Sequence, residues 1–180
     1  MNHLTPELLV RLQNRSDERS FLTALDEWER AVASYQAQLT QVRGALPVDV
    51  QRLLDTVSLH DARVLDMWWG GRSQFTVTLQ LESDLSRLVV LTYSLVGPPE
   101  VQKDVLPGAV CSEPVAWLYD ELDFAKDKRP GEPSFTHSIL LSDGREVRLR
   151  FRSLTLKRPI PLVPVAPTED TDNPSIRHSA

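Results

Sequence analysis

The chain has 180 residues, a formal net charge of −5 and a hydrophobic content of 41%. That length suits one domain with an appendage, and the acidic balance argues against non-specific binding to nucleic acids or anionic membranes. A single cysteine, Cys111, excludes an internal disulfide and fits a reducing compartment. The N-terminus lacks a basic segment followed by an apolar run, and no apolar stretch approaches ~18 residues. We therefore expect a cytoplasmic protein without a membrane span.

Residues 1–58 predict a helical segment of three helices. Thr5 can cap the first helix and Pro6 suits its first position. The second helix is expected at 17–42, because its apolar residues alternate steps of four and three: Phe21, Leu25, Trp28, Val32, Tyr35, Leu39 and Val42. This heptad pattern has two interpretations: the helix lies over a sheet or against the first helix, or the segment 17–43 forms a homodimer or binds a partner protein. Pro47 opens a shorter third helix.

From residue 59 the pattern changes to β-strands, which alternate polar and apolar side chains. Gly70 and Gly71 predict a tight turn between strands at 62–69 and 72–81. A strand at 87–96 is apolar on both faces, as expected of a central strand covered on both sides. Residues 97–113 predict a short helix near 101–106 or a functional loop. Further strands are expected at 114–125 and in a hairpin from Phe135 onward.

The last hairpin fixes its own register. A three-residue loop of Ser142, Asp143 and Gly144 places apolar residues opposite each other: Ile139 and Val147, His137 and Leu149, and Phe135 and Phe151. A two-residue loop would instead oppose apolar and charged side chains. We therefore expect a type I turn with Gly144 in the left-handed conformation. The apolar positions change parity after Phe151, which predicts a bulge near Arg152 and Ser153.

The predicted architecture is α+β: N-terminal helices packed on a mainly antiparallel sheet of about six strands at 59–158. Residues 159–180 are expected to form a flexible tail rich in proline. Pro161, Pro164 and Pro167 repeat every third residue, as proline-groove ligands do, although an unstructured terminus also explains them.

No strong catalytic or metal-binding motif is present, and no cofactor is expected. A weaker set of acids and histidines supports an alternative hypothesis, a metal-assisted hydrolase, if the sheet brings them together: His60, Asp61, Asp120, Glu121 and His137. The competing interpretation is that the acids face water, that His60 and Asp61 lie at a helix exit, and that His137 is a satisfied sheet residue.

Two groups of residues are candidates for binding. Arg148, Arg150 and Arg152 form a charged row, which docks an acidic partner or a phosphate-rich ligand, or instead pairs with Glu121 and Asp123 on a neighbouring strand. Trp68 and Trp69 are adjacent, so one of them should face away from the core, and an exposed tryptophan beside a turn is a suitable binding hot spot.

Three segments resemble small bacterial proteins with an antiparallel sheet, some of which are similar to immunity proteins of contact-dependent toxin systems. The segments are Leu59 to Ala62, Tyr119 to Glu121 and His137 to Glu146. The resemblance implies the sheet but no activity. We therefore expect a non-catalytic protein that binds another protein, with no nucleic-acid or membrane partner.

Overall fold

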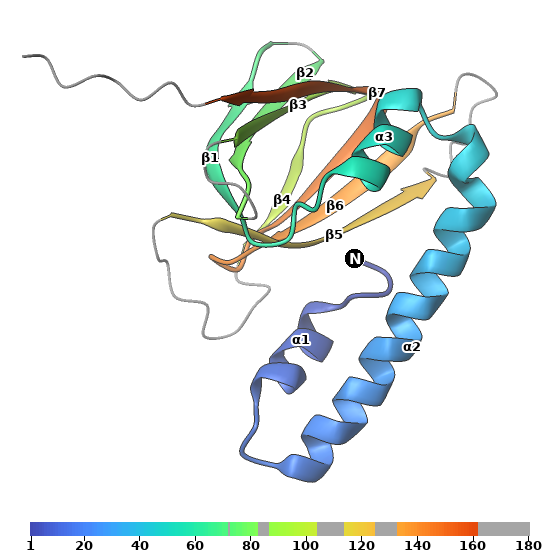
Figure 1. The fold of residues 1–180 in the computed structure, drawn as a ribbon, viewed down its shortest axis with the longest axis vertical. Coiled ribbons are helices and arrows are strands. Elements are labelled where there is room, and N and C mark those ends of the chain that lie inside the picture. The colour runs from blue at the N-terminus through green and yellow to red at the C-terminus, as the bar shows by residue number, and fades with distance from the viewer. Residues whose placement is uncertain (72, 83–86, 104–113, 125–132, 162–180) are drawn as a thin grey trace, which may run out of the picture.

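The structure is a computed structural model that describes residues 1–71, 73–82, 87–103, 114–124 and 133–161. Its helices are α1 (Pro6–Gln13), α2 (Glu18–Val42) and α3 (Val48–Thr56), and a short 3₁₀ turn spans Arg43–Ala45. The strands are β1 (Ala62–Trp69), β2 (Gln74–Gln80), β3 (Arg87–Leu95), β4 (Glu100–Gln102), β5 (Ala116–Phe124), β6 (Phe135–Leu141) and β7 (Glu146–Pro161). The α+β class is confirmed, and the sheet has seven strands because the short β4 joins it (Figure 1).

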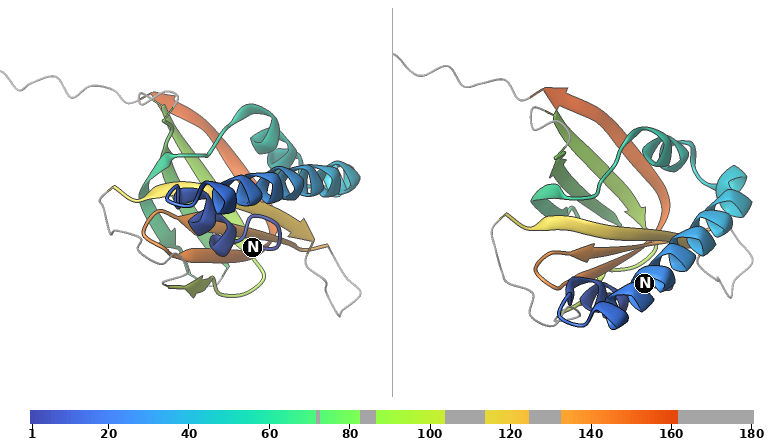
Figure 2. Two further views of the ribbon diagram at one scale, coloured as in Figure 1. Left: turned by 90° about the horizontal axis from the view of Figure 1, so that it is seen from below. Right: turned by 60° about the horizontal axis from the view of Figure 1, so that its bottom comes forward.

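The sheet closes on itself. Its strand order is β3-β2-β1-β5-β6-β7-β4, every described pairing is antiparallel, and β3 also pairs with β7. Six strands therefore form a closed ring, with β4 beside the first residues of β7. Figure 2 shows the sheet curving round, with α3 beside β7. Closure leaves one face of each strand inside the ring and the other outside.

The ring is weakest between β1 and β5. These strands pair only through Ala62 with Trp117 and Arg63 with Ala116, whereas β1 pairs with β2 along nearly its whole length. Beyond this point helix α2 covers the edge of β5, where the Tyr35 hydroxyl accepts a hydrogen bond of 2.6 Å from the Leu122 backbone N–H. An edge strand with unsatisfied backbone groups is thereby protected.

The predicted register of the last hairpin is confirmed. Phe135 pairs with Phe151, His137 with Leu149 and Ile139 with Val147. Gly144 has a φ of 80°, and its N–H bonds to the Leu141 carbonyl at 3.0 Å. The bulge is also where the parity change predicts it, because Ser94 pairs with Ser153 while Leu95 pairs with Phe151.

Gly144→Ala should lower the free energy of unfolding by about 1 kcal/mol, because alanine is strained at a positive φ. Urea denaturation of both proteins measures the difference. A variant as stable as the wild type would mean that the turn is not left-handed at this position.

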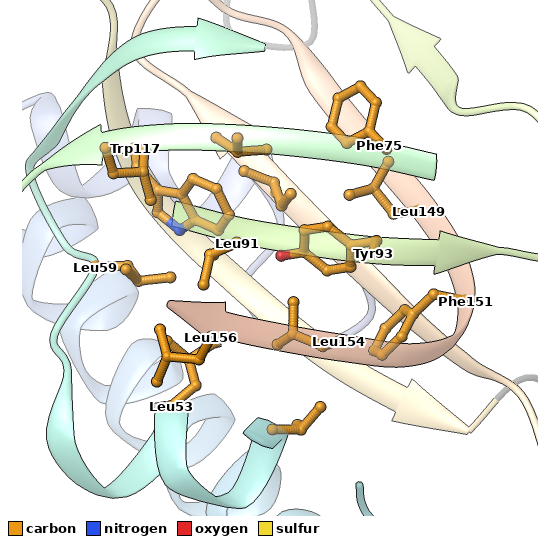
Figure 3. Close-up of a cluster of buried hydrophobic side chains, with 14 of the residues drawn as sticks. Leu53, Leu59, Phe75, Leu91, Tyr93, Trp117, Leu149, Phe151, Leu154 and Leu156 are labelled. Carbon is orange, nitrogen blue, oxygen red and sulfur yellow. The ribbon is translucent and has the colours of Figure 1, made fainter. Parts of the chain in front are cut away.

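The core fills the inside of the ring. It contains alternate residues of the strands, together with Val50 and Leu53 of α3. Figure 3 shows Tyr93, Phe151 and Leu154 gathered in this core. Val147, Leu149 and Phe151 are buried, whereas Arg148 is partly exposed and Arg150 exposed, as their alternation predicts.

The heptad face of α2 packs against other parts of the same chain. Its seven apolar residues are all half-buried. Trp28 packs edge-to-face on Tyr119 of β5, and Arg11 of α1 forms a two-pronged salt bridge with Glu27 at 2.7 and 3.0 Å. The interpretation that α2 lies against the sheet and α1 is thus confirmed. A homodimer through 17–43 stays a prediction, which light scattering of the purified protein tests.

Three local expectations differ from the structure. The Gly70 N–H bonds to the Gln74 carbonyl at 2.9 Å and β2 begins at Gln74, so the connection from β1 is longer than the predicted two-glycine turn. Strand β3 has one buried face, while its other face is half-buried to exposed, since none of the described helices covers it. The helix considered near 101–106 does not include Val101, which lies in β4 and pairs with Val147, while residues 104–113 lie outside the described residues.

The sheet extends further into the predicted tail than expected. β7 continues to Pro161, where it pairs with Arg87, so the first three residues of the predicted tail belong to the sheet. Residues 162–180, like Cys111, lie outside the described residues.

Candidate binding surface at strand β1

The arginine row lies on the outer face of β7. Arg148 donates to Ser138 at 3.3 Å and to Glu146 at 3.2 Å, so its carboxylate partner is on its own strand and is not Glu121. Arg150 donates to Ser134 at 3.3 Å. Arg152 is exposed at the bulge. A row already engaged in this way presents less charge to a partner than its sequence suggests.

A hollow of about 380 Å³ separates Arg148 and Arg150 from Glu121 and Asp123. The acids have partners of their own. Glu121 accepts backbone N–H groups from Asn2, His3 and Leu4, at 2.8 Å for His3. Asp123 accepts hydrogen bonds from the side chains of Asn2 at 3.1 Å and Gln38 at 2.9 Å. These bonds fasten the first residues and α2 to the sheet.

The five residues of the hydrolase hypothesis do not form one site. Asp120 and His137 face the inside of the ring, and Glu121, the next residue on β5, faces outward. His60 and Asp61 are partly exposed and contact each other at 3.2 Å. Among the described residues no three His, Cys, Asp or Glu side chains lie close enough to hold a metal ion.

Inside the ring, His137 joins β3 to β5. The Tyr93 hydroxyl lies 2.9 Å from His137 Nδ1, and His137 Nε2 lies 2.9 Å from Asp120 Oδ2. Trp117 Nε1 donates to the other oxygen of Asp120 at 2.9 Å. Tyr93 and His137 are fully buried, whereas the Asp120 side chain is 25% exposed. Its geometry is that of a satisfied polar network that fixes the core.

The electrostatics of this network follow from burial and hydrogen bonding. Burial alone would raise the pKa of Asp120, but the hydrogen bonds from His137 and Trp117 and the nearby imidazole hold this pKa below its usual value. Burial raises the pKa of Tyr93, which therefore stays neutral.

Asp120 should make the protein sensitive to acid. Because its pKa is lower in the folded than in the unfolded state, its contribution to stability is complete above about pH 4 and disappears as pH falls through the folded-state pKa. The difference in unfolding free energy between the wild type and Asp120→Asn should therefore narrow from pH 6 to pH 3. Urea titrations at several pH values measure it, and a constant difference would contradict the assignment.

Both tryptophans of β1 are exposed, Trp68 by 57% and Trp69 by 50%, although the sequence predicts only one. Trp68 pairs with Thr76 and lies on the outer face of the ring. Trp69 pairs with the buried Phe75, but it is the last residue of β1, so its ring lies at the rim. Leu65 is 49% exposed at a bulge in the same strand. Leu65, Trp68 and Trp69 together are called the tryptophan patch below.

Gly70 leaves room for the Trp68 indole. A Cβ at this position would lie 2.4 Å from Cζ3 and 2.6 Å from Cη2 of Trp68. The indole therefore lies directly over the glycine, and only glycine leaves room for it.

The sequence pattern does not reveal Leu65 or Gly70 as part of this surface. Leu65 is exposed because a bulge separates the pairs of Val64 with Leu79 and Asp66 with Thr78. The sequence indicates that Gly70 is a turn residue, and its contact with Trp68 is seen only in the three-dimensional structure. The adjacent tryptophans were the one available signal.

No protein-family model matches the chain, and no curated protein matches it. In the part of the chain that the structure describes, no helix has both the length and the apolar character needed to cross a membrane.

Proposed function

We propose that this protein is a non-catalytic binding module that engages another protein through the tryptophan patch. The observation that carries the proposal is the pair of adjacent indoles, each at least half exposed, at the end of a strand with little pairing on its other edge. Exposed tryptophan is unfavourable in water, and it is enriched at the centres of protein interfaces.

Two further observations support the choice of this surface. Arg148 is paired within its own sheet, so the arginine row is the weaker candidate. The Trp68 indole lies over Gly70, where any larger residue would meet it. We also propose that the module is immunity-like and meets its partner protein in the cytoplasm.

Affinity capture with matched baits tests the proposal. The wild type, a Trp68→Ser/Trp69→Ser variant and an Arg148→Ser/Arg150→Ser/Arg152→Ser variant are tagged alike and compared at equal folded concentration. We expect one protein to be recovered with the wild type and the arginine variant and lost with the tryptophan variant. Recovery that depends on the arginines and not on the tryptophans would refute the assignment of the surface.

A further inference from the structure

Strand β1 has two edges, and the edge that faces away from β2 is paired only at its start. The Val64 N–H bonds to the Val115 carbonyl at 2.8 Å, and the ladder between β1 and β5 contains only Ala62 and Arg63 on the β1 side. Among the described residues, none pairs with residues 65–69 on this edge. The tryptophan patch lies along this part of the strand.

The register with β2 shows which backbone groups point to this edge. The Gly70 N–H bonds to the Gln74 carbonyl, and hydrogen-bonded and non-hydrogen-bonded pairs alternate along an antiparallel ladder. Trp68, two residues before Gly70, therefore bonds to β2, whereas Met67 and Trp69 direct their N–H and C=O groups to the other edge. These two sets of groups are about 7 Å apart along the strand, which is the repeat of an extended backbone.

The side chains beside this edge are also accessible. Asp66 pairs with Thr78 and Trp68 with Thr76, so both project from the outer face of the ring, and both are exposed. A strand added along this edge would place one side chain beside Asp66 and another, two residues away, beside Trp68. A carboxylate favours a basic cross-strand neighbour, and an indole favours an apolar or aromatic one.

We infer that the partner protein contributes an extended segment that joins the ring as an additional strand along Met67 to Trp69, with a basic residue beside Asp66. This mode of binding rests on the proposed function, because it assigns a partner segment to the same patch. A partner that covered the indoles without pairing the backbone groups of Met67 and Trp69 would bury them unsatisfied, which is unfavourable. In strand addition the main-chain hydrogen bonds supply affinity and the flanking side chains supply specificity.

Amide hydrogen exchange followed by NMR tests the edge in the free protein. The amides of Met67 and Trp69 should exchange about tenfold faster, or more, than those of Asp66 and Trp68, which bond to β2. Slow exchange at both Met67 and Trp69 would overturn the inference, because another segment of the chain would already occupy the edge. Protection that increases with protein concentration would also overturn it, because a second copy would be the occupant.

Random heptapeptides displayed on phage and selected on the full-length protein test the occupant. We expect the enriched peptides to carry a basic residue two positions from an apolar one, and synthetic copies to protect the amides of Met67 and Trp69. Met67→Pro removes an outward N–H and spares the ladder with β2, so peptide binding should weaken about tenfold or more. Met67→Leu keeps the N–H, and this matched control should bind as the wild type does.

The peptides stand in for the partner, so this test is separate from affinity capture. The absence of enriched peptides, or peptides that bind Met67→Pro as tightly as the wild type, would overturn strand addition. If Met67→Pro does not fold, the two amides of the wild type decide: unchanged exchange with peptide bound would contradict the inference. A captured protein that needs the tryptophans but binds Met67→Pro equally well would refute strand addition and leave the proposed function standing.

Discussion

Phe151→Ala should lower the free energy of unfolding by about 3–5 kcal/mol, the range for removing a buried phenylalanine. Phe151 is fully buried in the middle of the core. Its ring packs edge-to-face on Tyr93 at 5.3 Å and lies 5.7 Å from Phe135. The substitution therefore leaves a cavity that rigid strands on several sides cannot close.

The matched control is Lys157→Ala, on the exposed face of the same strand. A surface substitution of this kind should change stability by no more than about 0.5 kcal/mol. Urea denaturation of the three proteins measures both effects. If both variants lost the same free energy of unfolding, the alternation along β7 would not separate residues inside the ring from residues outside it.

The second large effect is expected on binding. Trp68→Ala should weaken the complex with the captured partner by about 30-fold or more, which corresponds to a hot-spot contribution of about 2 kcal/mol. Because Trp68 is more than half exposed in the free protein, the substitution should leave the melting temperature nearly unchanged. Isothermal titration calorimetry with the purified partner measures the affinity.

Gly70→Ala separates the orientation of the indole from its presence. The added methyl group would occupy space within 2.6 Å of two Trp68 ring atoms, so the ring must move while both tryptophans remain. We expect weaker binding than in the wild type and stronger binding than in Trp68→Ala. Gly97→Ala is the matched control, because a Cβ there meets nothing within 4 Å. Unchanged affinity in Gly70→Ala would show that the fixed orientation of Trp68 does not matter.

Local patterns in the sequence predict much of this fold. Thr5 caps α1 by accepting a hydrogen bond from the Leu8 N–H, as predicted, and Gly144 takes the left-handed conformation that the register requires. These features depend on neighbouring residues, so a short stretch contains the information. The closure of the sheet cannot be predicted in this way, because the pairing of β3 with β7 joins segments more than 50 residues apart, and no local pattern indicates it.

The candidate site is also predictable only where it depends on neighbouring residues in the sequence. The adjacent tryptophans are visible in the sequence, but their joint exposure depends on where β1 ends relative to the ring. His137 is predicted as an inward-facing residue, whereas its partners Tyr93 and Asp120 come from two other strands. The acids of β5 could not be assigned from sequence, because neighbouring residues on one strand face opposite sides.

Site-specific photo-crosslinking tests the account most directly. A photoreactive phenylalanine derivative at position 68 should form a covalent adduct with the partner, whereas the same residue at position 157, on the exposed face of β7, should not. Adducts from position 157 and none from position 68, in proteins that bind the partner equally well, would contradict the claim that the indoles of β1 form the binding surface.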